Sequence, residues 1–171
     1  MNKIIISDAS TLILLQKIAL LDKLVKNFEF IISPEIYGEA VVKGKKIKSE
    51  DSYSIESKID SGIIKVKKIK DGKRVNQIID EFNLEKGETE AIVLFLQENA
   101  DILAIDDHKA INVCKIYKIP FITALTFVIT ALDAKVIMKN EAEEMVRNLG
   151  IYGRYKDELI YKALNYLGEK K

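Results

Sequence analysis

The chain has 171 residues, of which 48% are hydrophobic and 31% charged, with a formal net charge of +1 at pH 7. This length and composition predict one folded domain with a sizeable core and exclude a disordered chain. The net charge does not indicate a polyanionic partner, and the single Cys114, expected to be a buried structural thiol, fits a reducing cytosol. No apolar stretch reaches the ~20 residues that cross a bilayer, so we expect a soluble cytoplasmic protein without a membrane partner.

The first residues alternate apolar runs with helical patterns. Lys3–Ser7 is typical of a buried parallel strand, which ends at Asp8 and is followed by a helix. A second apolar strand is expected over Phe28–Ile32. The Ser33-Pro34 pair after it suits the cap and first position of a helix, which we expect over Glu35–Val42.

The middle of the chain predicts an exposed strand between helices. A helix over Glu50–Ser61 should end at Gly62. Apolar and lysine residues alternate over Ile63–Ile69, which is typical of an edge strand. Two further helices are expected, over Lys73–Phe82 and over Glu88–Asn99, and Gly87 should introduce the second of them.

The last part continues the alternation. Its predicted elements are strands over Ile102–Ile105 and Pro120–Ile122, helices after each strand to Tyr117 and from Ala124, and a final helix over Tyr155–Leu167 beyond a break at Gly150–Gly153. Strands that alternate with helices indicate βαβ units. The predicted fold class is therefore α/β, a three-layer α/β/α sandwich around a mainly parallel sheet.

Four carboxylates stand at predicted strand ends or near the starts of helices, namely Asp8, Glu39, Glu88 and Asp106. Because function gathers at the carboxyl ends of parallel strands, we expect these acids to cluster at one edge of the sheet. Like charges in apolar surroundings repel, and such a cluster is typical of a site for a hard divalent cation such as Mg²⁺ or Mn²⁺. Taken singly, each acid also fits an ordinary role as a helix cap, a first-turn acid or a solvated residue.

Four segments resemble the successive motifs of the PIN domain, and most closely those of a prokaryotic branch of predicted nucleic-acid-binding proteins. They are Ile4–Ile13, Ser33–Ala40, Leu84–Phe95 and Leu103–Val113. The resemblance runs over nearly the whole chain and implies a single PIN-like domain over residues 1–171, with a C-terminal helical extension over about 139–171. Where the branch commonly has a Gly-Thr pair after the last strand, this chain has Thr123-Ala124.

The resemblance implies a role for each acid and for its neighbours. The implied catalytic residues and metal ligands are Asp8, Glu39, Glu88 and Asp106, with Asp107 as a further ligand and Ser10, Glu90 and Thr123 as supporting residues.

Glu90 also competes with Glu88 for the place of the third acid. Helical residues two apart point about 200° apart, so the two cannot both face the site. The resemblance favours Glu88, because the spacing from Glu88 to Asp106 matches that of the PIN motifs. The only histidine, His108, is expected to be exposed and not a ligand.

Two groups of lysines suggest a path for a nucleic acid. They include Lys43, Lys45, Lys46, Lys65, Lys67 and Lys68. On one face of the protein, these side chains would attract a phosphate backbone and make binding salt-dependent. Lysines on edge strands and loops also guard against aggregation, and the sequence leaves both explanations open.

The acid cluster predicts a metal-dependent nuclease, and the resemblance implies an endoribonuclease that hydrolyses RNA phosphodiester bonds. The resemblance further implies a toxin of the VapC kind, homodimeric and neutralised by a small antitoxin protein, although an RNA-processing enzyme would use the same chemistry. The alternative from another class is a non-catalytic PIN-like module that binds RNA or a protein. The sequence leaves open which RNA is cut and whether one or two metal ions bind.

Overall fold

The computed structural model describes residues 3–169, so residues 1–2 and 170–171 of the predicted domain and extension lie outside the described residues. Within this range five strands form one sheet, in which every neighbouring pair is parallel and the order is β3-β2-β1-β4-β5. The strands are β1 (Lys3–Ser7), β2 (Phe28–Ile32), β3 (Ile64–Val66), β4 (Ile102–Ala104) and β5 (Phe121–Ile122).

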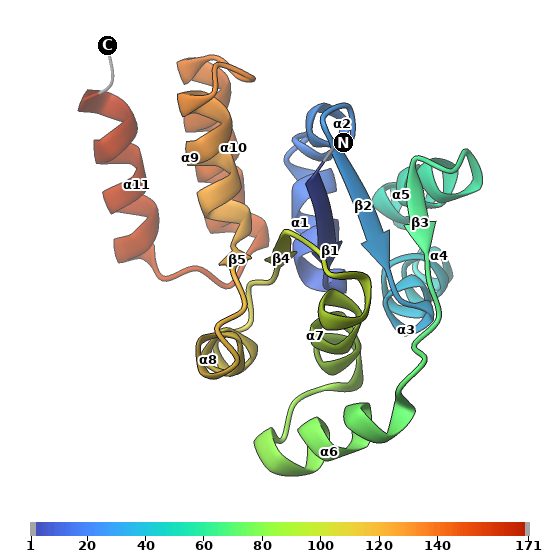
Figure 1. The fold of residues 1–171 in the computed structure, drawn as a ribbon. Helices are drawn as coiled ribbons and strands as arrows, with labels where there is room; N and C mark the ends of the chain where they lie inside the picture. Colours follow the sequence, from blue (N-terminus) through green and yellow to red (C-terminus); the bar gives the residue numbers. More distant parts are fainter. Residues whose placement is uncertain (1–2, 170–171) are drawn as a thin grey trace.

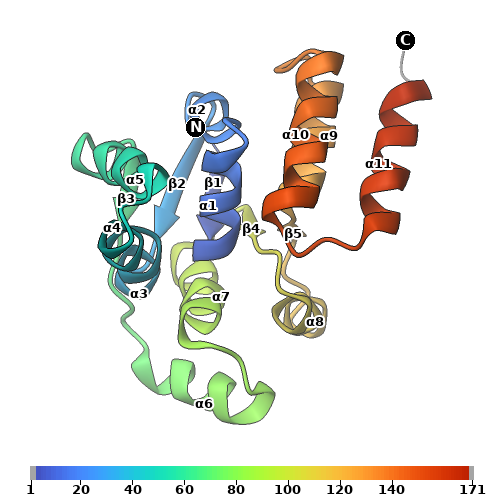
Figure 2. The ribbon, with the colours of Figure 1, turned by 180° about the vertical axis from the view of Figure 1, so that it is seen from behind.

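Helices cover both faces of the sheet, as Figures 1 and 2 show from opposite sides. Helices α1 (Ala9–Lys17) and α5 (Glu50–Asp60) lie on one face, and α7 (Lys86–Glu98) packs on β1 and β4 from the other. The remaining helices are α2 (Leu21–Leu24), α3 (Pro34–Tyr37), α4 (Gly44–Lys46), α6 (Gly72–Phe82), α8 (His108–Ile116), α9 (Ala124–Asp133), α10 (Lys139–Tyr152) and α11 (Asp157–Glu169). The predicted α/β/α sandwich with a parallel sheet is confirmed.

Strands β1 and β2 are apolar on both faces because helices cover each side of the sheet. Ile5, Ile6, Phe30 and Ile31 are at most 2% exposed, and each such side chain stabilises the fold by roughly 1.5–3 kcal/mol. The outer strand β3 has the exposed side chains expected of an edge strand, although it is shorter than the predicted Ile63–Ile69. No helix among residues 3–169 combines the length and apolar character needed to cross a membrane.

The strand order places a crevice between β1 and β4. The chain builds outward from β1 through β2 to β3, and then returns to the other side of β1 for β4 and β5. In open parallel sheets, ligands bind beyond the carboxyl ends of the strands at this kind of reversal. Asp8 follows β1 directly, and Asp106 comes two residues after β4.

The prediction of one regular helix over Glu35–Val42 is wrong. Ser33 caps α3 and Pro34 is its first residue, as predicted, but the chain then continues as a π-helix, η1 (Gly38–Lys43), before α4. π-helical turns are rare and occur frequently at functional sites. The sequence offers no periodicity that distinguishes such a turn from an α-helix.

Two glycines were given the wrong role. Gly87 does not precede a helix, because α7 begins at Lys86. Gly150 does not break a helix either, because α10 runs through it to Tyr152, and the predicted break comes at Gly153 instead. The side chain of Ile160 on α11 lies 3.4 Å from the place where a Cβ of Gly150 would be. Packing against α11 offsets the weak helix preference of glycine at this position.

Candidate functional site

The carboxyl ends of β1 and β4 border a cleft of about 560 Å³, which we name the acidic cleft. Its acidic lining residues are Asp8, Glu39, Glu85, Glu88, Asp106 and Asp107. These side chains come from the ends of two strands, from η1 and from the start of α7. Distant parts of the sequence therefore converge on one hollow.

Asp8 is the most buried acid of the acidic cleft, with 3% of its surface exposed. One carboxylate oxygen accepts a hydrogen bond from the Thr11 N–H at 2.8 Å and so caps α1, while the other accepts from the Ser10 hydroxyl at 3.0 Å. Burial raises the pKa of Asp8 to about 6, with a smaller contribution from the charge of Asp106, against the effect of these hydrogen bonds. The same side chain thus caps a helix and lines the cleft.

Asp106 is held by donors from three other segments. The Thr11 hydroxyl donates to Oδ2 at 2.8 Å, the Ala124 N–H at the start of α9 donates at 3.1 Å, and the Tyr155 hydroxyl donates to Oδ1. Burial nevertheless raises the pKa of Asp106 above its ordinary value. Burial, together with the nearby charge of Asp106, raises the pKa of Tyr155, so the phenol keeps its proton.

Glu88 and Glu90 point to different surroundings, as residues two apart on a helix must. Glu88 lines the acidic cleft, accepts a hydrogen bond from the Glu85 N–H at 3.2 Å, and has a pKa raised to about 7 by burial and by the charge of Asp107. Glu90 is 8% exposed, and its nearest cation is Lys86 at 3.9 Å. Its Oε2 atom has no hydrogen-bond partner among the described residues. The structure brings Glu88 to the other acids and leaves Glu90 outside the lining.

Glu39 reaches the acidic cleft from η1, where it rests on the first turn of α7. A Cβ atom at Gly87 would lie 2.9 Å from Oε2 of Glu39, so a residue larger than glycine would displace this carboxylate from its position. Burial raises the pKa of Glu39, although Lys43 lies 3.7 Å away and favours the charged form.

The other predicted site residues have mixed surroundings. Ser10 and Asp107 both line the acidic cleft, and Asp107 also caps α8 through the Ala110 N–H at 3.0 Å. Thr123 is not a lining residue and caps α9 through the Thr126 N–H. His108 is exposed, as expected, but its side chain is also part of the lining. Their roles toward a metal stay predictions.

Most of the predicted nucleic-acid-binding lysines are engaged in ion pairs. Each pair joins one lysine to one glutamate: Lys43 with Glu39, Lys45 with Glu56, Lys65 with Glu29, and Lys67 with Glu98. Lys46 and Lys68 are exposed and have no ion pair with a described residue. None of the six lines the acidic cleft. The two lysine groups therefore form a weaker positive surface than their number suggests.

Sequence analysis missed several residues at the acidic cleft. Glu85 lines it, Thr11 and Tyr155 hold Asp106, and Lys17 and Arg154 are its lysine and arginine residues. Lys17 is paired with Asp51 at 2.6 Å, whereas Arg154 has no ion pair with any residue in the range 3–169. The only local signal for Arg154 and Tyr155 was the predicted break before them, which carries no information about what they contact.

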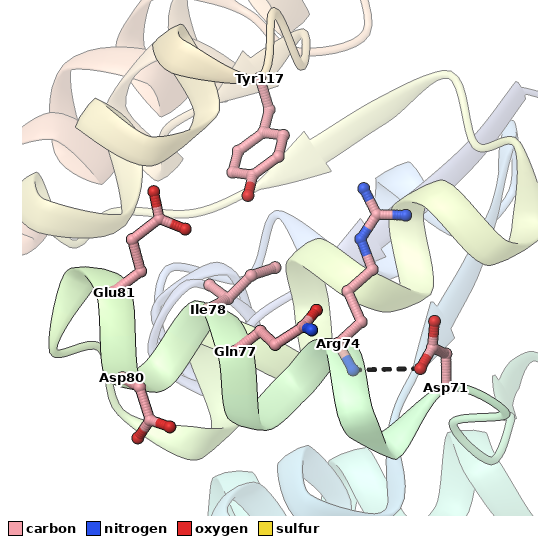
Figure 3. Close-up of a pocket in the computed structure, with 7 residues that line it drawn as sticks. All are labelled: Asp71, Arg74, Gln77, Ile78, Asp80, Glu81 and Tyr117. Atoms are coloured by element: carbon pink, nitrogen blue, oxygen red, sulfur yellow. Dashed lines mark hydrogen bonds between the residues drawn. The ribbon is translucent and has the colours of Figure 1, made fainter.

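A second hollow, of about 780 Å³, lies between α6 and the end of α8 (Figure 3). Figure 3 shows the Tyr117 hydroxyl directed toward α6, which contributes Arg74, Gln77, Ile78, Asp80 and Glu81. Asp80 and Glu81 are exposed, so this hollow lacks the desolvated carboxylates of the acidic cleft. It also contains no residue that sequence analysis assigned to chemistry.

The donor set of the acidic cleft fits a hard divalent cation, because carboxylate oxygens are the ligands that Mg²⁺ and Mn²⁺ prefer. The raised pKa values of Asp8 and Glu88 show the same excess of negative charge and burial, which a bound cation would relieve. Within the described residues no three acidic, histidine or cysteine side chains already converge as a metal site. Binding would therefore require these side chains to rotate toward one another.

The comparison with protein families agrees with the fold. A family model described as a PIN domain matches residues 4–169, which is almost the entire chain. A search of curated proteins gave no match.

Proposed function

Since this chain belongs to the PIN-domain family, a family of nuclease-type folds that act on nucleic acids, we propose that it is an endoribonuclease that hydrolyses RNA phosphodiester bonds with the help of Mg²⁺ or Mn²⁺. The observation that carries this proposal is the acidic cleft at the β1–β4 crevice. Several of its carboxylates are partly or fully buried. The arginine beside them, Arg154, has no ion pair with a described residue. A non-catalytic binding module has no need for such a costly arrangement of like charges.

The residues of this chain would have the following roles in the reaction. Asp8, Glu39, Glu88 and Asp106 would hold the cation, with Asp107 beside them. When bound, the cation polarises the phosphate and lowers the pKa of a water molecule. The Ser10 hydroxyl and the Thr11 N–H keep the Asp8 carboxylate in place.

Arg154 is suited to the substrate phosphate, because a guanidinium matches phosphate geometry and this one has no ion pair with a described residue. No nucleophile from the protein is required. The only thiol, Cys114, is buried, and burial raises its pKa to about 12, so it is inert as a nucleophile.

The biological setting is the finer part of the proposal. A toxin role, with a small antitoxin as partner and a homodimeric assembly, is supported by the resemblance to VapC-like toxins alone. RNA processing would use the same cleft. A small companion reading frame immediately upstream of the gene would support the toxin, and its absence would favour processing.

The test is cleavage of a mixed RNA pool by the purified protein with Mn²⁺ or Mg²⁺, compared with EDTA. We expect cleavage that depends on the metal and that Asp8→Asn and Asp106→Asn each abolish, while circular dichroism shows both variants folded. His108→Ala serves as the matched control at the rim of the cleft and should cut nearly as well as the wild-type protein.

The other outcomes separate the alternatives. RNA that is bound but not cut under any metal condition would favour the binding module. Unchanged cleavage by both aspartate variants would show that the active site lies elsewhere. A large loss in His108→Ala would add the histidine to the site.

A further inference from the structure

The link between α10 and α11 places an aromatic side chain directly on an acid of the acidic cleft. In Figure 1 this link runs at the level of the carboxyl ends of β4 and β5. It lies at the β5 edge of the sheet, as α8 does. Tyr155, in the middle of the link, donates its hydroxyl hydrogen to Oδ1 of Asp106 and accepts a hydrogen bond from the Leu125 N–H at 3.1 Å. The phenol therefore connects the start of α9 to Asp106. Tyr155 and Asp106 themselves are 49 residues apart in the sequence.

The ring of Tyr155 lies very close to the backbone of Gly153 in this link. A Cβ atom at Gly153 would lie 2.7 Å from Cδ2 of Tyr155 and 2.7 Å from the Leu149 carbonyl oxygen. The backbone of Gly153, with φ −90° and ψ 169°, is open to any residue, so the glycine is required for the close approach and not for its conformation.

Three donors from three segments fix the carboxylate of Asp106. Thr11 holds Oδ2, Tyr155 holds Oδ1, and the Ala124 N–H lies within hydrogen-bond distance of both oxygens. An ionised carboxylate can accept about four hydrogen bonds. Because the single Ala124 hydrogen is shared between both oxygens, the three donors set the orientation of the group and still leave capacity for a cation. Tyr155 itself does not line the acidic cleft.

We propose that Tyr155 is a positioning residue of the nuclease site, which holds Asp106 in the orientation that binds the metal and thereby makes the α10–α11 link part of the site. This inference rests on the proposed nuclease function. Groups that hydrogen-bond a metal-ligating carboxylate fix its geometry, and their loss typically lowers metal affinity or activity about 10–100-fold.

The experiment compares Mn²⁺ binding by the full-length wild-type protein and variants, measured by isothermal titration calorimetry without RNA. Tyr155→Phe keeps the ring and its packing and removes only the hydroxyl. Tyr161→Phe makes the same chemical change on α11 at a side chain that is 67% exposed and lies outside the cleft lining. Asp106→Asn is the reference for loss of a proposed ligand.

We expect Tyr155→Phe to weaken Mn²⁺ binding by about 10-fold or more, with Tyr161→Phe unchanged. RNA cleavage by Tyr155→Phe should show a lower kcat at limiting Mn²⁺, an unchanged KM for RNA, and recovery at high Mn²⁺ concentration. A merely structural tyrosine would lower the unfolding temperature without this metal-dependent recovery.

Two results would overturn the inference, and they can be told apart. Normal Mn²⁺ affinity and kcat in Tyr155→Phe, together with loss of both in Asp106→Asn, would remove Tyr155 from the site and leave the nuclease proposal standing. A wild-type protein that neither binds Mn²⁺ nor cleaves RNA would remove the nuclease proposal, and the inference with it.

Discussion

The carboxylate of Asp8 has two roles. It caps α1, and it contributes a buried negative charge to the acidic cleft. The cap stabilises the fold, since its oxygen satisfies a helix N–H. The charge opposes folding, because burial disfavours the ionised form. An asparagine in the same place keeps the first contribution and removes the second.

The first prediction follows from this conflict. The pKa of Asp8 in the folded protein, about 6, is above its ordinary value of 3.8, so the folded state holds the proton more tightly than the unfolded state. Its contribution to stability is complete below about pH 4 and is lost as the pH rises through about 6. Without metal, Asp8→Asn should therefore be more stable than the wild-type protein at pH 8, by at most about 3 kcal/mol, and equally stable near pH 4. Urea unfolding in EDTA at both pH values measures this, and an equal difference at both would contradict it.

The second prediction separates the two glutamates of α7. Glu88→Gln removes a carboxylate from the acidic cleft, and we expect cleavage to fall at least about 100-fold, at the upper end of the losses seen when a neighbour of a metal ligand is removed. Glu90→Gln should cut RNA at nearly the wild-type rate, because Glu90 does not line the cleft. Cleavage rates of the two variants at saturating Mn²⁺ are the measurement. The opposite ranking would identify Glu90 as the third acid.

Among the secondary-structure elements, α7 shows how closely packing and the site are joined. Its first turn lies against the carboxylate of Glu39 on η1, and Gly87 is the residue that permits this approach. Glycine is unfavourable in a helix, by up to about 1 kcal/mol relative to alanine. The helix keeps it where a larger residue would displace an acid of the cleft.

The third prediction is that Gly87→Ala separates stability from activity. The added Cβ meets the flexible end of Glu39, so the protein should fold with unchanged stability or a gain of up to about 1 kcal/mol, while the displaced carboxylate lowers cleavage by about 10-fold. Gly72→Ala, at the first position of α6 with nothing within 4 Å of the new atom, is the control. Thermal unfolding and RNA cleavage are compared for both. Full activity in Gly87→Ala would argue against a role for Glu39.

These elements also show what the sequence can and cannot predict. The ends of β1 and β4 were visible as short apolar runs followed by acids, so the common position of Asp8 and Asp106 could be inferred from the behaviour of parallel sheets. Helix geometry showed that Glu88 and Glu90 cannot both face the site, and the spacing of the PIN motifs favoured Glu88, which does line the cleft. The π-helical turn at Glu39 had no signature, because its residues are compatible with an ordinary helix.

Contacts between distant residues escaped prediction for a different reason. Tyr155 and Asp106 are 49 residues apart, and no local pattern reports which side chain a link will place on a given carboxylate. The lysines were visible, but the glutamates that neutralise Lys45, Lys65 and Lys67 come from other elements. Only the folded arrangement shows which charges are cancelled.

Around the acidic cleft, the positive charges available to an RNA strand are few. The formal net charge is +1, several lysines are paired, and the lining of the cleft has six acids against one lysine and one arginine. Arg154 is the arginine at the cleft, and it belongs to the same link as Tyr155. The residues expected to form a C-terminal extension thus contribute three side chains, Tyr152, Arg154 and Tyr155, to the surroundings of Asp106 and the other acids.

The fourth prediction concerns the salt dependence of RNA binding. If Arg154 contacts one phosphate of a single strand, Arg154→Ala should reduce the slope of log Kobs against log salt by about 0.7. Arg147→Ala, an exposed arginine of α10 that does not line the cleft, should leave the slope unchanged. Fluorescence anisotropy with single-stranded RNA in EDTA measures binding without cleavage. Equal slopes for both variants would exclude this contact.

The hydrogen bond from Tyr155 to Asp106 also has a consequence for the order in which the protein is made. Translation adds roughly 5–20 residues per second from the N-terminus, so Asp8 and all five strands of the described sheet are synthesised before Tyr155. A nascent chain that still lacks this residue holds Asp106 with fewer donors than the finished protein does. Until Tyr155 has been added, the Asp106 carboxylate of a chain held at the ribosome lacks the donor that we propose fixes its orientation.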